Sequence, residues 1–203
     1  MRHLRNASIT PTMIENAYFN GFFPMADERG EIGFYAFEPR GIIPLDDRFT
    51  VRRSLRQILN KQQYTITFDR APRDVLSACS RKNQVPAYEL WLSEDLIEQF
   101  MRLFEQGRAH TVEVWEPHTG RLVGGLYGLA FGGVFSGESM FSRAPFASQI
   151  ALVNLVERLR TQGFVLLDAQ MVSEHLKQFG LYECPQAEYL KQFHKAAALP
   201  VKF

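Results

Sequence analysis

The pattern of apolar and polar positions is most regular between residues 121 and 143, where it predicts two strands joined by a tight turn. The strands are expected over Arg121–Ala130 and Gly133–Ser139, with the turn at Phe131-Gly132-Gly133. Glycines interrupt this pattern at positions 124, 125, 128 and 137. Glycine weakens a strand and often marks a bulge, or a place where another backbone or a ligand comes close. We therefore expect something to approach the backbone of this hairpin closely.

Helical periodicity and short apolar runs divide the rest of the chain into alternating elements. Helices are expected over Thr10–Asn20, Thr50–Gln62, Ala71–Ser80, Ser93–Gln106, Phe146–Gln162, Ser173–Phe179 and Glu188–Ala198, and further strands over Ile32–Phe37, Tyr64–Phe68, Thr111–Trp115 and Phe164–Asp168. This order predicts an α+β protein with helices flanking a mixed, mainly antiparallel sheet, compatible with the acetyltransferase-like (GNAT) architecture. Residues 1–47 are predicted to form a small N-terminal lobe, and residues 48–203 the GNAT-like catalytic domain.

Length and composition fit a soluble globular protein. The chain has 203 residues, of which 46% are hydrophobic and 22% are charged, an ordinary balance. Its longest apolar runs are far shorter than the roughly 20 residues of a membrane helix, and its first residues lack the apolar stretch of a signal peptide. Two cysteines cannot form a disulfide framework, and five scattered histidines predict no zinc site. We therefore expect a cytoplasmic protein that does not associate with membranes.

Positive charge is concentrated in one part of the chain, although the formal net charge is only +1. The interval 48–82 contains two acidic residues and nine basic ones: Arg48, Arg52, Arg53, Arg56, Lys61, Arg70, Arg73, Arg81 and Lys82. Such a cluster can be an ordinary solvated helix face. It can also bind a polyanion, because arginines neutralise phosphates and release their counterions.

Polar side chains follow two apolar strands, and they are the main candidates for chemistry. Glu138 and Asp168 each end such a strand, and Gln170 lies two positions after Asp168. Because side chains two apart in a strand point to the same side, Asp168 and Gln170 are expected to bind one group together. We expect both strand ends to face one pocket. A site with acids and amides but no evident nucleophile suits direct transfer between two bound reactants; a merely architectural pair of carboxylates is the alternative.

Several known motifs can be excluded. The segment GESMF differs from a nucleophile elbow, because Phe141 stands where that motif requires Gly. No phosphate-binding Walker A sequence is present, and the hairpin glycines do not fit the dinucleotide-binding pattern. The loop that cradles the pyrophosphate of coenzyme A is also missing before the helix that begins at Phe146. An ordinary acetyl-CoA-dependent enzyme is therefore disfavoured.

Taken together, several segments closely resemble the bacterial leucyl/phenylalanyl-tRNA–protein transferases. These are GGLYGLAFGGVFSGESMFSR, LLDAQ, AYFNGFFP and PRG, with Trp91 before its helix, and the resemblance covers nearly the whole chain. It implies a monomeric enzyme that moves Leu, Phe or sometimes Met from Leu-tRNA, Phe-tRNA or a related donor to the N-terminal Arg or Lys of a protein. The modified protein would enter the N-degron degradation pathway. The resemblance implies no metal and no coenzyme, because the ester bond of the charged tRNA supplies the activation.

The resemblance also implies roles for individual residues. Asp168 and Gln170 would orient the acceptor amine and Glu138 would position the terminal adenosine, while the group that takes the proton stays open between Asp168 and a ribose hydroxyl. The other implied contacts are an apolar donor pocket at Leu126 and Phe135, with Gly137 and Ser139 beside Glu138; stacking at Trp91, Phe34 and Tyr35; and a tRNA surface at Arg52, Arg53, Arg56 and Lys61.

The chain departs from the family's pattern at several positions. Phe34 and Tyr35 replace paired tryptophans, Gln149 replaces a lysine, and Leu126 stands where relatives often have Met. The preference among Leu, Phe and Met therefore stays open. Two alternatives remain: a small-molecule N-acyltransferase, which would need the missing coenzyme A loop, and a non-enzymatic tRNA-binding protein, against which the intact Glu138, Asp168 and Gln170 argue.

Overall fold

A seven-stranded mixed sheet forms the centre of the protein, for which we use a computed structural model that describes residues 9–27, 31–80 and 92–203. Its strands are β3 (Arg40–Ile43), β4 (Thr65–Phe68), β5 (Ala109–Trp115), β6 (Leu122–Phe131), β7 (Val134–Ser142), β8 (Leu166–Gln170) and β9 (Tyr182–Cys184). The strand order is β4-β5-β6-β7-β8-β3-β9. Within this sheet β7 and β8 are parallel, whereas the other neighbours are antiparallel. A separate small sheet pairs β1 (Phe23–Ala26) with β2 (Ile32–Tyr35).

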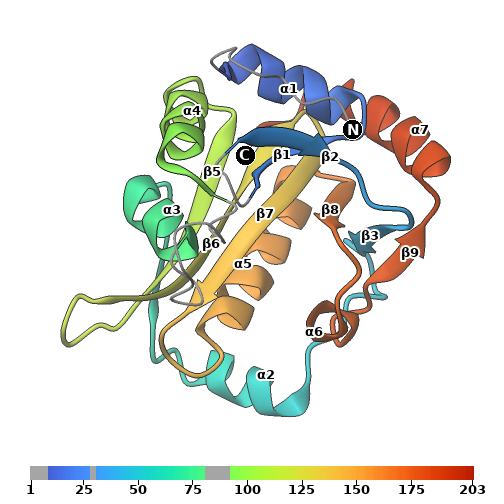
Figure 1. Cartoon of the computed structure of the whole chain (residues 1–203). Helices are drawn as coiled ribbons and strands as arrows, with labels where there is room; N and C mark the ends of the chain where they lie inside the picture. The colour runs from blue at the N-terminus through green and yellow to red at the C-terminus, as the bar shows by residue number, and fades with distance from the viewer. Residues whose placement is uncertain (1–8, 28–30, 81–91) are drawn as a thin grey trace.

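Helices cover both faces of the large sheet (Figure 1). They are α1 (Pro11–Phe19), α2 (Arg53–Asn60), α3 (Pro72–Ser80), α4 (Glu94–Glu105), α5 (Ala147–Gln162), α6 (Glu174–Lys177) and α7 (Gln186–Ala197). One apolar core contains buried residues of α1, α3, α4 and α7, and the other is built around α5. The predicted α+β class with flanking helices is therefore confirmed. Within the described ranges, no helix is long and apolar enough to cross a membrane.

The ends of the helices follow from local sequence signals. The Thr10 hydroxyl accepts a hydrogen bond from the Met13 amide at 3.3 Å, and Pro11 takes the first helical position. Ser93 caps α4 in the same way. α5 ends at Gly163, whose φ of +86° suits a residue without a side chain. These helix boundaries agree with the predicted ones to within about three residues.

The N-terminal segment enters the large sheet, which the apolar pattern does not predict. β3, which falls within the residues of the expected lobe, lies between β8 and β9 of the large sheet. Its residues Ile42 and Ile43 are buried and belong to the two different cores. The pattern predicts neither β1 nor β9, which have four and three residues. The division at residue 47 stays a prediction.

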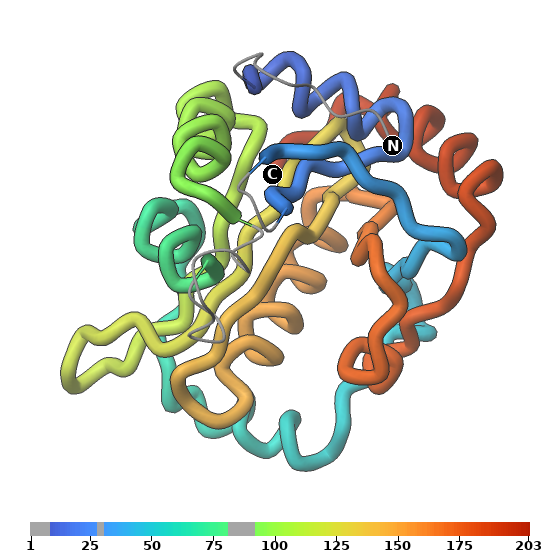
Figure 2. Tube along the Cα trace, in the orientation of Figure 1, coloured from blue at the N-terminus to red at the C-terminus, as the bar shows by residue number. Residues whose placement is uncertain are grey.

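The parallel strands β7 and β8 stay together over a short distance only. Val134–Ser136 pairs with Leu166–Asp168, and beyond these residues the two strands separate (Figure 2). α5, which connects them, packs against β5, β6 and β7. Separation ends the hydrogen-bond ladder and leaves room between the two strands. The pocket described below occupies this place.

Glycine is present at the positions of the hairpin for different structural reasons. A Cβ atom at Gly124 would lie 2.5 Å from the Cβ of Ala147, so this glycine lets α5 pack closely on β6. At Gly128 a Cβ would collide with the Ser136 carbonyl oxygen and the Phe135 ring. At Gly137, in contrast, a Cβ would meet the Asp168 carbonyl oxygen at 3.6 Å, an ordinary contact. Close packing within the protein thus accounts for Gly124 and Gly128, while Gly137 borders the open space.

Candidate active site

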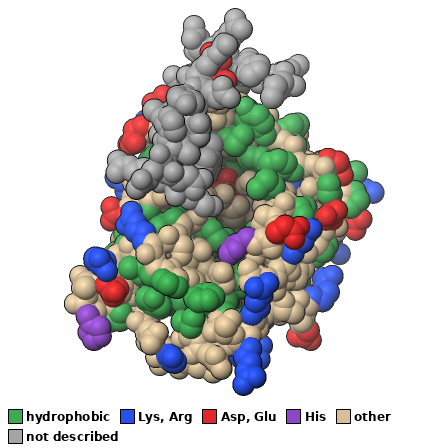
Figure 3. All heavy atoms as spheres, turned by 60° about the horizontal axis from the view of Figure 1, so that its bottom comes forward, with side chains coloured by type: hydrophobic (Ala, Val, Ile, Leu, Met, Phe, Trp, Pro, Cys, Tyr) green, Lys and Arg blue, Asp and Glu red, His purple; other side chains and the backbone are tan. Residues whose placement is uncertain are grey.

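A cavity of about 470 Å³ lies where β7 and β8 separate. One part of its lining is apolar and belongs to the core around α5: Ile43, Leu126, Met140, Leu152, Leu155 and Leu167. It is also lined by Phe23, Met25, Phe37, Tyr127, Glu138, Asp168 and Gln170. Figure 3 shows this hollow with acidic atoms in its depth and a histidine side chain at its rim. The volume lies within the range of small-molecule sites, and the few polar groups among apolar walls are typical of them.

Two irregularities in the sheet aim polar side chains into this cavity. On β7, Gly137 pairs with Gly128 and Ser139 pairs with Tyr127, so Glu138 is an extra residue without a partner on β6. On β8, Asp168 and Gln170 pair with successive residues of β3, so Ala169 is the extra residue. Such bulges bend a strand and redirect its side chains, often beside active sites.

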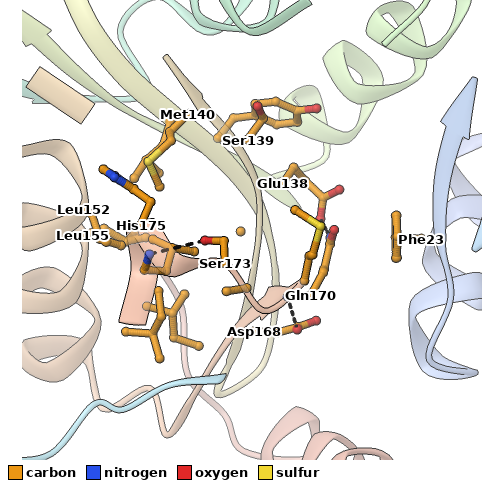
Figure 4. Close-up of a pocket in the computed structure, with 18 of the residues that line it drawn as sticks. Phe23, Glu138, Ser139, Met140, Leu152, Leu155, Asp168, Gln170, Ser173 and His175 are labelled. Carbon is orange, nitrogen blue, oxygen red and sulfur yellow. Dashed lines mark hydrogen bonds between the residues drawn. The ribbon is translucent and has the colours of Figure 1, made fainter. Parts of the chain in front are cut away.

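The two bulged strands meet through a hydrogen bond between side chains. The Gln170 amide nitrogen donates to a Glu138 carboxyl oxygen at 2.7 Å (Figure 4). Gln170 also has a φ of +60°, an uncommon conformation for a residue other than glycine. The expectation that both strand ends face one pocket is therefore confirmed by the geometry.

Asp168 has no free hydrogen-bonding position. Its Oδ1 accepts from Arg40 Nε at 3.0 Å and from the Gln170 backbone amide at 2.8 Å. Its Oδ2 accepts from Arg40 Nη2 and the Tyr189 hydroxyl, both at 2.8 Å, and from the Ser136 hydroxyl at 3.5 Å. A carboxylate has about four acceptor sites, and Asp168 is fully buried. Asp168 and Gln170 both line the cavity, but Arg40, Tyr189 and the Gln170 amide occupy the oxygens of Asp168. A joint contact of both side chains with one ligand group would therefore need one of these bonds to break.

Arg40 joins three parts of the chain in this buried network. Besides its two bonds to Asp168, its Nη1 donates to the Gly21 carbonyl oxygen at 2.9 Å, just after α1. The guanidinium also lies 4.5 Å from the ring centroid of Tyr189 on α7. Burial alone would lower the pKa of Arg40, but the Asp168 carboxylate more than offsets it, and the pKa is raised. Arg40 therefore stays charged in an interior from which water is excluded.

Glu138 is the carboxyl group of the site with the clearest electrostatic perturbation. Burial raises its pKa from 4.5 to about 7, although hydrogen bonding by Tyr18 and Gln170 opposes the increase. The hydroxyls of Tyr18 and Tyr127 are buried, and neither has a hydrogen bond of normal geometry within the described part of the chain. Burial, followed by the charge of Glu138, raises the pKa of both tyrosines. Glu138 thus exchanges a proton near neutral pH in a polar corner of an apolar cavity.

The remaining predicted substrate contacts are only partly brought together. Leu126, Gly137 and Ser139 line the cavity. Phe135 does not, because it is fully buried in the α5 core against Phe203 at 5.4 Å. Two further predicted residues, Phe34 and Tyr35, pack on the other core. Trp91 lies outside the described residues.

Sequence reasoning missed an aromatic pair at the edge of the cavity. The rings of Phe23 and Phe37 are stacked at 5.4 Å with an interplanar angle of 22°. Arg40 lies 5.6 Å from the Phe23 ring centroid. Phe37 is 36% exposed and lines the cavity. Its position two residues before the PRG segment is the one signal that could have marked it.

The predicted tRNA surface is exposed and differs from the rest of the basic cluster. Arg48 pairs with Asp46, and Arg73 pairs with two glutamates of α4. The α2 basic face, by which we mean Arg52, Arg53, Arg56 and Lys61, is exposed. Within the described ranges, none of its four side chains forms an ion pair. Its charge is therefore available to a polyanion.

Comparison with known proteins finds relatives along nearly the whole chain. A family model described as "Leucyl/phenylalanyl-tRNA protein transferase" matches residues 42–194, and a model of that family's N-terminal domain matches residues 7–36. A Herpetosiphon aurantiacus protein named leucyl/phenylalanyl-tRNA–protein transferase is 46% identical over 96% of this chain and 98% of its own length. A Rubrobacter xylanophilus protein of the same name is 43% identical over the same shares. Among solved structures, "The structure of L-PGS from Bacillus licheniformis" is 20% identical, covers 67% of this chain and 48% of that one, and has a TM-score of 0.47.

The raised pKa of Glu138 predicts how a Glu138→Gln variant changes stability with pH. Between pH 4.5 and about 7 the folded protein keeps a proton that the unfolded chain releases, so the free energy of unfolding falls as the pH rises. Glutamine cannot titrate. The variant should therefore gain stability relative to the parent on going from pH 4.5 to pH 8, as measured by denaturant unfolding. If the free energies of unfolding of the variant and the parent differ by the same amount at pH 4.5 and at pH 8, the raised pKa of Glu138 is contradicted.

Proposed function

The chain belongs to the leucyl/phenylalanyl-tRNA–protein transferase family and is an enzyme, and we propose that it transfers Leu or Phe, with Met as a third donor, from aminoacyl-tRNA to the N-terminal Arg or Lys of proteins. The products would be cytoplasmic substrates of the N-degron pathway. The observation that carries this proposal is the cavity between the separated strands, with apolar walls on one side and the Glu138–Gln170 pair on the other.

The apolar side of the cavity suits the donor's side chain. Leu126, Leu152 and Leu155 are almost fully buried and offer flexible, unbranched-at-β surfaces. A Leu, Phe or Met side chain would fill this end. Val and Ile would place a branch against the narrow part between β7 and β8, and each misplaced methyl group costs about 1–3 kcal/mol in discrimination.

The proposed reaction is attack by the acceptor's α-amine on the carbonyl carbon of the aminoacyl ester. The new carbon–nitrogen bond forms, the bond between the carbonyl carbon and the ribose oxygen breaks, and the tRNA leaves with a free hydroxyl. Glu138, whose pKa is about 7, takes the amine's proton and returns it to the departing ribose oxygen. A base with a pKa near the working pH is the most efficient.

Asp168 has an indirect part in this proposal. Its oxygens are occupied by Arg40, Tyr189 and the Gln170 backbone, so it neither binds the acceptor nor takes its proton. It holds Gln170 instead. The Gln170 side chain orients Glu138 through the 2.7 Å hydrogen bond and leaves its own carbonyl oxygen for the acceptor amine.

Phe37 is proposed to stack on the terminal adenine of the donor. The adenine is joined to the ester through one ribose, so it must lie beside the Glu138–Gln170 pair. Phe37 borders this region, it is 36% exposed, and the Phe23 ring stacks on one of its faces. Aromatic side chains bind nucleobases in this way without reading their sequence. Phe34 and Tyr35 are half-buried and pack against the core, and the stacking expected of them stays a prediction.

The direct test of the proposed function is transfer of labelled Phe from Phe-tRNA to a peptide that begins with Arg. We expect transfer to N-terminal Arg and Lys peptides, no transfer when the peptide's amine is acetylated, and transfer about 10- to 200-fold slower when Val-tRNA is the donor. Consumption of acetyl-CoA without transfer from tRNA would instead support the N-acyltransferase alternative. Binding of tRNA without any transfer would support a non-enzymatic protein.

The α2 basic face predicts a salt-dependent contact with the tRNA backbone. Each lost phosphate contact lowers the slope of log affinity against log salt by roughly 0.7–0.9. Replacing Arg52, Arg53 and Arg56 together by Ala should therefore lower the magnitude of this slope by about 2–3, measured by titration of tRNA at several salt concentrations. Arg73→Ala is the matched control, because Arg73 is exposed but already paired with Glu94 and Glu98. Normal binding by the triple variant would place the tRNA elsewhere.

Phe37→Ala is predicted to weaken the donor but not the acceptor. Loss of a stacked base costs about 1–3 kcal/mol, and a base stacked on one side should raise the KM for Phe-tRNA about five- to tenfold. The KM for the Arg peptide should change less than about twofold. Phe22→Ala is the control, because Phe22 is 42% exposed and does not line the cavity. Equal effects of the two variants would rule out stacking on Phe37.

A further inference from the structure

We infer that Arg40 and Tyr189 are positioning residues, which set the geometry of Gln170 and Glu138 through Asp168. The inference rests on the proposed transfer reaction, but neither residue borders the cavity. Both are fully buried, and neither was assigned a role from the sequence. They act on the reacting groups through a chain of hydrogen bonds, each of which has a defined length in the structure.

The first step in this series of hydrogen bonds consists of the bonds that hold the Asp168 carboxylate. The guanidinium of Arg40 binds both carboxylate oxygens, at 3.0 and 2.8 Å, in a two-point contact. The Tyr189 hydroxyl adds a third bond at 2.8 Å. Two parallel bonds from a planar group fix the rotation of a carboxylate, which a single bond does not. The remaining acceptor position on Oδ1 then points in a defined direction.

The second step is the hydrogen bond by which Asp168 restrains the Gln170 backbone. A residue with a side chain and φ near +60° costs about 1–3 kcal/mol and persists only when its surroundings fix it. At Gln170 the fixing bond is the 2.8 Å contact from its amide to Asp168 Oδ1. In the sheet Gln170 pairs with Gly41 of β3, next to the bulge at Ala169. The rotation of Asp168 therefore decides where the Gln170 side chain meets Glu138.

The third step connects this geometry to the N-terminal segment. Arg40 Nη1 donates to the Gly21 carbonyl oxygen at 2.9 Å, and Gln186 of α7 donates to the same oxygen at 3.0 Å. Gly21 ends the turn after α1, and α1 carries Tyr18 to Glu138. The Arg40 side chain therefore couples the position of α1 to the orientation of the Gln170 side chain. A lysine could keep the charge but could not reach Asp168 and Gly21 in one plane.

Two conservative variants and one control test the inference. Arg40→Lys should lower kcat about 10- to 100-fold, because a misplacement of about 1 Å costs up to that factor, while the KM for Phe-tRNA stays within about twofold. Tyr189→Phe removes one hydroxyl and should lower kcat about fivefold, the equivalent of one hydrogen bond of about 1 kcal/mol. Tyr182→Phe, on the neighbouring strand β9, removes a hydroxyl that faces Arg48 and not Asp168, and should leave kcat unchanged.

Two readouts separate positioning from a loss of folded protein. The first is the side-chain amide NMR signal of Gln170, assigned by its absence in Gln170→Leu, which should shift in Arg40→Lys and Tyr189→Phe but not in Tyr182→Phe. The second is the pH profile of kcat. The charged groups around Glu138 are Arg40 on β3 and Asp168 on β8, the other titratable groups are Tyr18 and Tyr127, and the charge of Arg40 lowers the pKa of Glu138. Arg40→Met should therefore move the acid limb of the profile to higher pH, whereas Arg40→Lys should not.

The outcomes are distinct. An unchanged kcat in Arg40→Lys, or a lowered kcat with an unshifted Gln170 signal, would overturn the inference. If Arg40→Met fails to fold, Tyr189→Phe still decides the matter, because it removes a single oxygen atom. If the parent enzyme transfers no aminoacyl group at all, the proposed function fails, and the NMR signal alone then tests whether Arg40 and Tyr189 position Gln170.

Discussion

The site depends on one buried ion pair, between Arg40 and Asp168. A buried ion pair is weak support for stability, since apolar residues of the same volume often stabilise a protein as well or better. The contribution of this pair is to fix the orientation of the Asp168 carboxylate. It fixes a carboxylate that holds the backbone of Gln170 in an uncommon conformation, and it connects β8 to α1 and α7. Removing either charge would leave the other buried and unpaired, which is strongly destabilising.

The separation of β7 and β8 creates the cavity beside which Asp168 and Gln170 are oriented. Three residue pairs hold the strands together, and a bulge on each strand follows at once. The bulges bring Glu138 and Gln170 into contact across the gap, while α5 supplies an apolar wall behind them. Irregular backbone thus sits beside regular, well-packed elements. A reacting pair placed on a rigid sheet is held more accurately than one placed on a loop.

Much of this arrangement could be predicted from the sequence, because it depends on local signals. Caps such as Thr10 and Ser93, and the glycine that ends α5, mark the helices well. The meeting of Glu138 with the LLDAQ strand follows from two polar residues at the ends of apolar strands. The directions of the Asp168 and Gln170 side chains could not be predicted in this way. The rule that side chains two apart point to the same side assumes a regular strand, and β8 has a bulge at Ala169.

Other features depend on long-range contacts that a sequence pattern does not encode. Arg40 is 128 positions from Asp168, and a lone arginine in a Pro-Arg-Gly turn gives no sign that it will be buried. The same holds for Tyr189 in the last helix. Phe135 alternates correctly in its strand, yet it faces the α5 core rather than the cavity. The glycines at 124 and 128 predict that something comes close to the backbone, and the structure shows that the approaching groups belong to the protein itself.

The most direct measurement is a crystal structure of the protein with 3′-phenylalanylamido-adenosine, a donor analogue whose amide bond resists transfer. We predict that the phenyl ring lies among Leu126, Leu152 and Leu155, that the amide carbonyl lies beside Glu138 and Gln170, and that the Arg40–Asp168 pair is unchanged. A ligand bound outside the space between β7 and β8, or a carbonyl group placed against Asp168 with Arg40 displaced, would contradict it.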